Sequence, residues 1–143
     1  MRTLLHTTLA VHPLCLGGNV FGWTADKDQS FEVLDRYAAA GGNFVDSADV
    51  YSVWADGNEG GESESVIGAW MAQRGNRDDM VVATKVGKLP GSEGLSAATI
   101  HKAADASLQR LGTDHIDLYY AHADDQDTPL EETLGAFDAL ASA

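Results

Sequence analysis

The chain has 143 residues and a mass of 15.1 kDa, the size of one ordinary domain that can bury a core. Apolar residues make up 44% and charged residues 22% of the sequence, a composition that excludes a disordered chain. The chain has 9 Lys and Arg against 22 Asp and Glu, a formal net charge of −13, which disfavours binding to nucleic acid or to an anionic membrane surface.

Cysteine content and hydropathy predict where the protein resides. Cys15 is the only cysteine, so the chain cannot form an internal disulfide, and we expect its side chain to be buried. No stretch approaches the ~18 apolar residues of a membrane-spanning helix, and polar residues interrupt the apolar pair Leu4 and Leu5 near the start. These features predict a soluble cytoplasmic protein.

The first half of the sequence alternates between strand-like and helix-like patterns. Residues 13–19 form a short apolar run ended by glycines, which predicts a strand. A helix follows, with Asp28 as its expected N-cap and Gly41 as its expected stop. Residues 43–47 predict a second strand, and a polar, glycine-rich loop separates it from a second helix over 63–74.

The second half continues the alternation. Residues 80–85 are apolar on both faces, as in a buried parallel strand. Ser96 is the expected N-cap of a third helix, which Gly112 ends. Residues 115–120 predict a fourth strand, and Thr128, followed by proline and a glutamate three residues on, is the expected N-cap of the last helix.

Strand and helix therefore alternate four times, which predicts an α/β fold with a parallel sheet in a (βα)4 unit. Such a unit is either a small open α/β sandwich or half of a (β/α)8 barrel, which normally needs about 250 residues. In the half-barrel interpretation, residues 14–18 and 116–120 are open strand edges.

Polar residues occur where the predicted strands end. Asp46, Lys85 and His122 follow three consecutive strands, and Tyr51 lies five residues after Asp46. The carboxyl ends of parallel strands meet at one edge, about 4.8 Å apart per strand, so we expect these side chains to lie together. Lys85 needs a counter-charge, which Asp46 supplies, and its ammonium favours the phenolate of Tyr51. A neutral His122 would orient a carbonyl, so the cluster predicts proton donation to a carbonyl oxygen, with the hydride coming from a cofactor.

Other interpretations of the same residues remain open at this point. Each of the four has an ordinary structural explanation on its own, and the functional interpretation depends on their co-location. Lys85 would also suit a Schiff-base aldolase. The acidic stretch after His122 would offer oxygen ligands to a hard cation, and it contains Asp124, Asp125 and Asp127. A protein without enzymatic activity that keeps the fold is the third alternative.

At these residues the sequence resembles the aldo-keto reductase superfamily. The resemblance rests on five blocks in order, which are in register with the predicted elements and cover essentially the whole chain. They are Leu14–Gly18 (LCLGG), Gly42–Tyr51 (GNFVDSADVY), Gly61–Gly68 (GESESVIG), Val82–Gly87 (VATKVG) and Leu108–His122, which includes DHIDLYYAH. The Asp46–Tyr51 interval is that of the family.

The resemblance implies an NAD(P)H-dependent carbonyl reductase built on a (β/α)8 barrel, acting on a small carbonyl substrate without a metal. Tyr51 would be the proton donor, Lys85 would promote its ionisation, Asp46 would hold Lys85, and His122 would orient the carbonyl. The nicotinamide-ribose end of the cofactor would lie near Gly18, Asn19 and Asp46. The resemblance also implies that Trp23 and Trp54 line the substrate side.

The family barrel has eight βα units, whereas this sequence contains four, so residues 1–143 are expected to form a single domain truncated after the fourth unit. In the family the second half supplies most of the cofactor site, which leaves the choice between NADPH and NADH open. A half barrel exposes two strand edges, so we expect it to associate with itself or with a complementary half. A catalytically incomplete half that needs such a partner is the alternative function.

Overall fold

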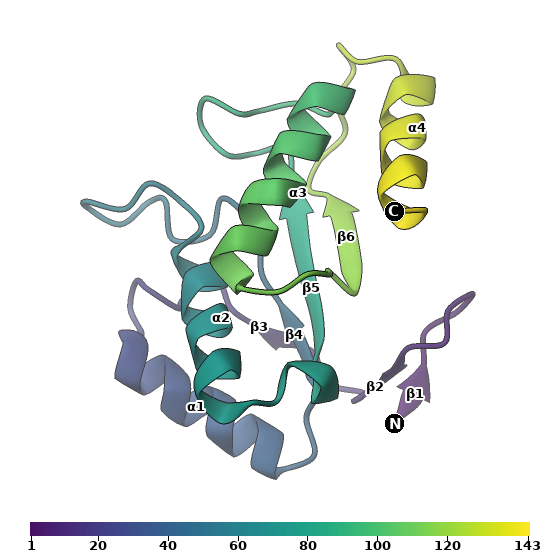
Figure 1. Cartoon of the computed structure of the whole chain (residues 1–143). Helices are drawn as coiled ribbons and strands as arrows, with labels where there is room; N and C mark the ends of the chain where they lie inside the picture. The colour runs from purple at the N-terminus through teal and green to yellow at the C-terminus, as the bar shows by residue number, and fades with distance from the viewer.

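A computed structural model describes residues 1–143. Its elements alternate as the sequence predicts, after a short hairpin at the start (Figure 1). In chain order they are β1 (Arg2–Thr3), β2 (Ala10–Val11), β3 (Leu16–Gly17), α1 (Lys27–Ala39), β4 (Phe44–Asp46), α2 (Glu62–Arg74), a 3-10 turn (Arg77–Asp79), β5 (Val81–Val86), α3 (Ala97–Leu111), β6 (Leu118–Ala121) and α4 (Leu130–Ala141).

The main sheet has four parallel strands in the order β3-β4-β5-β6. Figure 1 shows α1, α2 and α3 covering one face of this sheet, with the hairpin beyond the other side. The sheet alternating with helices matches about half of a (β/α)8 barrel, which confirms the predicted (βα)4 unit. Strands β3 and β6 are its edges, as predicted.

The core lies between the sheet and its helices. A cluster of 11 buried residues joins α1, α2 and the start of the sheet, and two of its members, Trp70 and Leu34, are fully buried. A smaller cluster of 5 residues, which includes Val86 and Ile100, joins α3 and α4 to the end of β5. The longest helix, α3, has 15 residues, and no helix could span a membrane.

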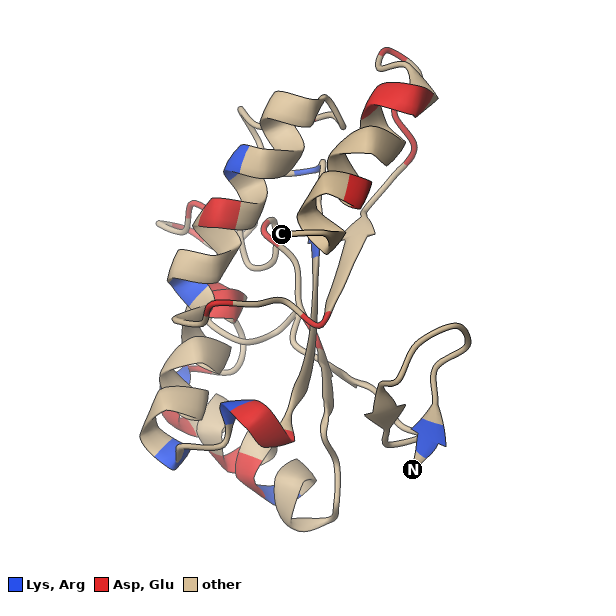
Figure 2. Cartoon of the chain, turned by 45° about the vertical axis from the view of Figure 1, so that its right-hand side comes forward, with Lys and Arg blue, Asp and Glu red and all other residues tan.

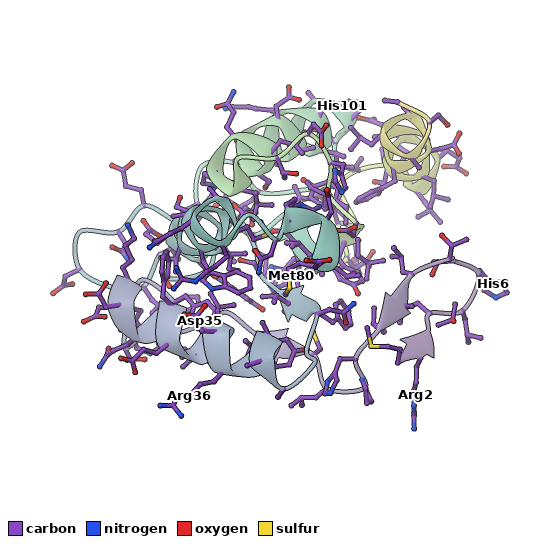
Figure 3. The ribbon with its side chains drawn as sticks, turned by 60° about the horizontal axis from the view of Figure 1, so that its bottom comes forward. Arg2, His6, Asp35, Arg36, Met80 and His101 are labelled. Atoms are coloured by element: carbon purple, nitrogen blue, oxygen red, sulfur yellow. The ribbon has the colours of Figure 1, made fainter.

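Helices α1 and α2 are also joined by a polar contact at their facing sides. Asp35 accepts hydrogen bonds from the Trp70 indole (2.8 Å) and from Arg74 Nε (2.9 Å). Figure 3 shows Asp35 on the side of α1 that faces α2, whereas Arg36 points away from the rest of the chain. Arg74 holds the pKa of Asp35 down to about 2, with the Trp70 hydrogen bond as the next cause.

The hairpin of β1 and β2 was not predicted from the sequence. Its strands have two residues each, which is too short for an alternating pattern to show. Arg2 and His6 on this hairpin point away from the other elements (Figure 3). Asn43 ties the hairpin to the sheet, because its amide oxygen accepts from the His12 backbone and its amide nitrogen donates to the Ala10 carbonyl.

Two predicted helix caps were wrong. The N-cap of α1 is Asp26 rather than Asp28, because Asp26 forms a capping box in which it accepts from the Gln29 backbone and the Gln29 side chain accepts in return. The N-cap of α4 is Pro129 rather than Thr128. The Thr128 hydroxyl is already engaged, since it donates to Asp125 at 2.7 Å.

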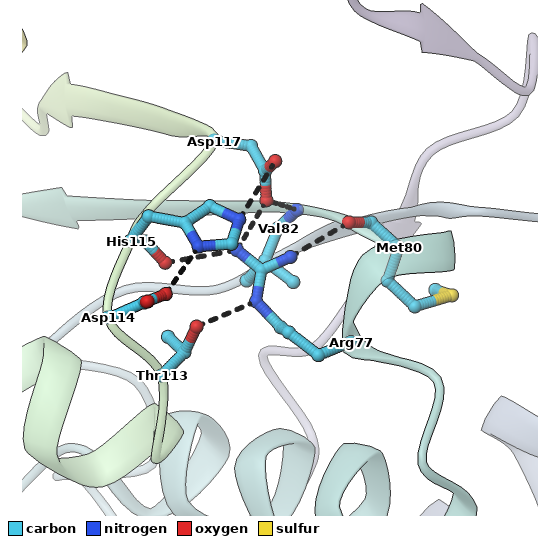
Figure 4. A network of polar contacts seen from close by, with 7 residues as sticks. All are labelled: Arg77, Met80, Val82, Thr113, Asp114, His115 and Asp117. Carbon is cyan, nitrogen blue, oxygen red and sulfur yellow. Dashed lines mark hydrogen bonds and ion pairs between the residues drawn. The ribbon is translucent and has the colours of Figure 1, made fainter.

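The fourth strand begins at Leu118, three residues later than the sequence pattern predicts. Figure 4 shows the reason, a network around Arg77. The Asp117 carboxylate accepts from Arg77 Nη2 at 2.7 Å and from the Val82 backbone N–H. The Val82 N–H is therefore bound by a side chain rather than by a backbone carbonyl of the neighbouring strand. Arg77 further donates to the carbonyls of Met80 and His115 and to the Thr113 hydroxyl.

Cys15 is exposed, so its predicted burial was wrong. It precedes Leu16, which packs against the main core, and successive side chains of a strand point to opposite faces. Cys15 therefore lies on the face of the sheet that no helix covers. A groove of about 560 Å³ lies between this open face and the hairpin, and its lining includes Cys15, Phe44, Leu118 and Tyr120.

Candidate active site

Charge is nearly absent from the main sheet. Asp46 and Lys85 are the only charged residues within its four strands. Most other Asp, Glu, Lys and Arg residues lie on helices and loops (Figure 2). Asp46 is the last residue of β4, and Lys85 is the next-to-last residue of β5, so both lie at the carboxyl end of the sheet. This is the end at which parallel α/β folds place their functional groups.

Lys85 is the centre of the cluster. Its ammonium donates to Asp46 Oδ2 (2.7 Å), to the Ser47 carbonyl (2.6 Å) and to the Tyr51 hydroxyl (2.9 Å). These three acceptors match the three N–H donors of an ammonium. The side chains of Lys85 and Asp46 are 14% and 25% exposed, so the ion pair is shielded from water but reachable from one side.

Tyr51 returns to the cluster from the loop after β4. Its hydroxyl donates to Asp46 Oδ2 at 3.2 Å, and the Lys85 nitrogen lies 4.5 Å from the centre of its ring. Backbone bonds hold this loop to β5: the Ser47 N–H donates to the Ala83 carbonyl and the Asp49 N–H to the Lys85 carbonyl. The loop therefore brings Tyr51 into contact with both Asp46 and Lys85.

His122 lies beside these three residues without a hydrogen bond to them. It directly follows β6, and the centre of its ring is 6.0 Å from that of Tyr51 in an edge-to-face arrangement. Burial lowers the pKa of His122, Lys85 and Lys88 lower it further, and Asp46 raises it. The ring is thereby held neutral, with its Nδ1 buried and unpaired.

The remaining predicted residues fall into two groups. Trp23 and Trp54 are 48% and 47% exposed and contact each other edge to face, with ring centres 5.7 Å apart, and Trp54 also lies 6.2 Å from the Tyr51 ring. Asn19 is exposed near the end of β3. Gly18 is buried, and an added Cβ would lie 2.8 Å from Ser63 Oγ, so its lack of a side chain serves close packing against α2.

Two alternatives lose support from this geometry. A Schiff-base aldolase needs a free amine, whereas all three donors of Lys85 are engaged. The acidic stretch after β6 lines a hollow of about 380 Å³, and Asp125 there accepts from the Leu95 backbone and the Thr128 hydroxyl. No three His, Cys, Asp or Glu side chains gather closely enough to hold a metal ion.

Sequence reasoning missed a set of polar side chains behind the cluster. They are fully buried, lie between the sheet and α2, and are called the buried polar layer below: Ser47, Asp49, Ser63, Glu64 and Thr84. Ser47 and Thr84 directly adjoin Asp46 and Lys85 in the sequence and point to the opposite face. That alternation of polar residues at the ends of two strands is the signal that could have revealed the layer.

Comparison with known proteins gives a consistent result. The model of the aldo/keto reductase family matches residues 13–143. A norsolorinic acid reductase of Emericella nidulans is 39% identical over 152 residues, which cover 94% of this chain and 38% of that protein. An uncharacterized 11.2 kDa protein of Pseudescherichia vulneris is 52% identical over 88 residues, which cover 61% of this chain and 85% of that protein.

A solved structure shows the same arrangement. The holo form of an aldo-keto reductase from Bacillus halodurans superposes with a TM-score of 0.82 at 35% identity, covering 99% of this chain and 46% of that one. The chain thus spans less than half the length of this reductase and of the Emericella relative. By the family match over nearly all its residues and by its fold, the chain belongs to the aldo/keto reductase family.

Proposed function

We propose that this chain carries the proton-donating site of an NAD(P)H-dependent reductase of aldehydes or ketones, with Tyr51 as the proton donor. One observation carries the proposal: Lys85 Nζ lies within hydrogen-bond distance of both Asp46 Oδ2 and the Tyr51 hydroxyl. Family membership supports the reaction type, and the Emericella relative is named a reductase.

The proton transfer follows from these contacts. The Tyr51 O–H bond breaks and its proton goes to the substrate's carbonyl oxygen, which leaves a phenolate 2.9 Å from the Lys85 ammonium. Opposite charges at that separation attract strongly where water is partly excluded. Asp46 and the Ser47 carbonyl hold the ammonium in place, so little reorganisation is needed when the phenolate forms.

His122 would orient the carbonyl. A neutral imidazole can donate one hydrogen bond and accept another, and the lowered pKa of His122 keeps the ring in this form at neutral pH. Its position beside the Tyr51 ring would direct a bound carbonyl oxygen toward the phenol.

The cofactor NADPH or NADH would supply the hydride for the carbonyl carbon when it is bound. This chain fits only part of such a molecule. Asn19 and Asp46 border the open mouth and would contact the nicotinamide-ribose end. Lys85 is fully engaged and Lys88 is the other cation close to the mouth, so the phosphates would depend mainly on residues outside this chain.

The two tryptophans would define the substrate side. Trp23, Trp54 and Tyr51 form a continuous series of ring contacts, and both indoles are about half exposed. A surface of this kind favours a substrate that carries a ring or another flat apolar group. We infer that aryl carbonyls are preferred over short alkyl ones.

A catalytically incomplete half is the second candidate. It is favoured by the unpaired edges of β3 and β6 and by the uncovered face of the sheet, on which Tyr120 is 38% exposed. In this function the chain would bind a complementary half, or a second copy of itself, before it binds a cofactor.

The test combines nucleotide binding and turnover on the full chain. Titration of NADPH and NADH, followed by nicotinamide fluorescence, is expected to show binding, and an aryl aldehyde is expected to be reduced. Tyr51→Phe should lower kcat/KM by at least about 100-fold and leave the nucleotide Kd within about twofold, because only the proton donor is lost. Tyr119→Phe is the matched control, since its hydroxyl is buried and unpaired.

The outcomes separate the two candidates. Binding together with Tyr51-dependent reduction supports the reductase. Failure to bind either nucleotide supports the incomplete half instead. Reduction that survives Tyr51→Phe would contradict the assigned proton donor.

A further inference from the structure

The buried polar layer contains one side chain whose polar atoms have no partner. Ser47 donates to Ser63 (2.9 Å), Ser63 donates to the Gly18 carbonyl (2.8 Å), and Thr84 donates to Glu64 Oε1 (2.5 Å). By contrast, neither carboxyl oxygen of Asp49 has a hydrogen-bond partner, although the residue is fully buried. Such groups are rare, and each one calls for an explanation.

The arginine that borders this layer is paired with the other carboxylate of the layer. Arg110 of α3 binds Glu64 Oε2 of α2 at 2.5 Å, so Glu64 has both an ion pair and the Thr84 hydroxyl. Asp49 is left facing four charged or titratable groups: Glu64 (α2), Arg110 (α3), Lys85 (β5) and Tyr119 (β6). A second carboxylate without a hydrogen bond is costly in such surroundings.

The protonation of Asp49 responds to this environment. Burial raises the pKa of Asp49 to about 6, the neighbouring Glu64 raises it as well, and Arg110, the adjacent Val50 backbone N–H and Lys85 act in the opposite direction. The acid form is therefore favoured in the packed structure and the ionised form in water.

Asp49 belongs to the segment that connects Asp46 to Tyr51, so a movement of this segment would change the candidate active site. Its backbone N–H donates to the Lys85 carbonyl at 3.2 Å, and it lies between Asp46 and Tyr51 in the chain. Separation of residues 46–51 from β5 would expose the Asp49 carboxyl to water and would move the Tyr51 hydroxyl away from Lys85 Nζ.

We propose that Asp49 is a positioning residue whose protonated carboxyl keeps residues 46–51 packed against β5 and α2, and whose ionisation opens this segment and withdraws Tyr51 from Lys85. The proposal rests on the proposed function only for its effect on turnover. Its structural consequence, a pH-dependent opening of one segment, holds whether or not the chain reduces a substrate.

The size of the effect follows from proton linkage. If opening returns Asp49 from a pKa of about 6 to its ordinary value of 3.8, the opening equilibrium rises about tenfold between pH 5 and pH 7.5. Asp49→Asn carries no titratable group there, so its opening equilibrium should not change over this range.

Hydrogen exchange on the full chain tests this. Exchange of residues 46–54 is followed by mass spectrometry at pH 5 and pH 7.5, corrected for intrinsic rates, in the wild type, Asp49→Asn and Asp56→Asn. Asp56 is an exposed aspartate of the same loop and serves as the matched control. We expect protection to fall about tenfold in the wild type and in Asp56→Asn, and to stay constant in Asp49→Asn.

A second measurement keeps the test valid if Asp49→Asn fails to fold. Carbon-13 NMR of the wild-type carboxyl groups should show one aspartate that titrates near pH 6, and protection of residues 46–54 should follow that titration. The same pH dependence in Asp49→Asn and wild type, or no aspartate titrating above the ordinary range, would overturn the proposal. Where turnover is measurable, kcat/KM should decline further above pH 6 in the wild type than in Asp49→Asn; exchange that behaves as expected without any turnover contradicts the proposed function alone.

Discussion

At the scale of single residues, the two carboxylates next to the site differ because their partners differ. Asp46 faces the open side and accepts from Lys85 and Tyr51. Asp49, three residues later, is fully buried and has no partner for either oxygen. The Asp46 carboxylate therefore holds the Lys85 ammonium in place, whereas Asp49 favours its protonated form.

The raised pKa of Asp49 predicts a pH dependence of stability. The folded chain binds this proton more tightly than the unfolded chain, so its contribution is present below pH 3.8 and is lost as the pH rises through about 6. Between pH 4.5 and pH 7.5 the wild type should lose about 2 kcal/mol of unfolding free energy that Asp49→Asn retains. Urea unfolding of both proteins at the two pH values measures this difference, and parallel losses would contradict it.

At the scale of elements, the helix ends and strand starts depend on particular side chains. Asp26 closes a capping box at α1, whereas Asp28 is the second residue of the helix, in its first turn, where its charge only interacts favourably with the helix dipole. Arg77 and Asp117 hold the residues before β6 against β5. The two residues lie 40 positions apart in the sequence, so a pattern of neighbouring residues cannot predict their contact.

The capping assignment makes a direct prediction. Asp26→Ala should cost about 1 kcal/mol of stability, because it removes the acceptor for the Gln29 backbone N–H. Asp28→Ala is the matched comparison and should cost clearly less. Thermal or urea unfolding of the two variants decides between them, and a larger loss for Asp28→Ala would restore the cap expected from the sequence.

The network at the start of β6 predicts a larger loss. Arg77→Ala leaves a poorly exposed Asp117 carboxylate without its cation and frees three further acceptors, so we expect a loss of about 3 kcal/mol. Arg36→Ala, on the outer side of α1 (Figure 3), should be nearly neutral. Equal unfolding free energies for the two variants would show that the network adds nothing to stability.

At the scale of the whole molecule, one face of the sheet is covered by helices and the other is open. The outer strands β3 and β6 each have one unpaired edge, and the groove beside the open face has an apolar lining that includes Leu118 and Tyr120. Exposed edges and apolar faces favour association. The net charge of −13 opposes it, so salt should strengthen it.

We therefore expect the chain to be larger than its 15.1 kDa monomer mass in light scattering at moderate salt. Tyr120→Lys puts a charge on the exposed edge strand and should shift the chain toward the monomer. Val33→Lys, a comparable change on the outer side of α1, should leave the mass unchanged. A sharp wild-type monomer peak would contradict this expectation.

Much of the fold was accessible from the sequence, because apolar periodicity and glycine or serine caps are local signals. The order of strands and helices, Ser96 and Gly112 as caps of α3, and the two open edges were all predicted correctly. The contact of Asp46, Tyr51 and Lys85 also followed from sequence, because parallel strands must end at the same side of the sheet.

Local patterns were enough to predict the alternation of elements and the residues at the strand ends, since these depend on neighbours a few positions apart. Three features arise only in the folded chain: the exposure of Cys15, the start of β6 at Leu118, and the burial of the Asp49 carboxyl behind the site. These features depend on residues such as Arg77 and Asp117, or Glu64 and Arg110, that lie 40 and 46 positions apart and meet only in the folded chain.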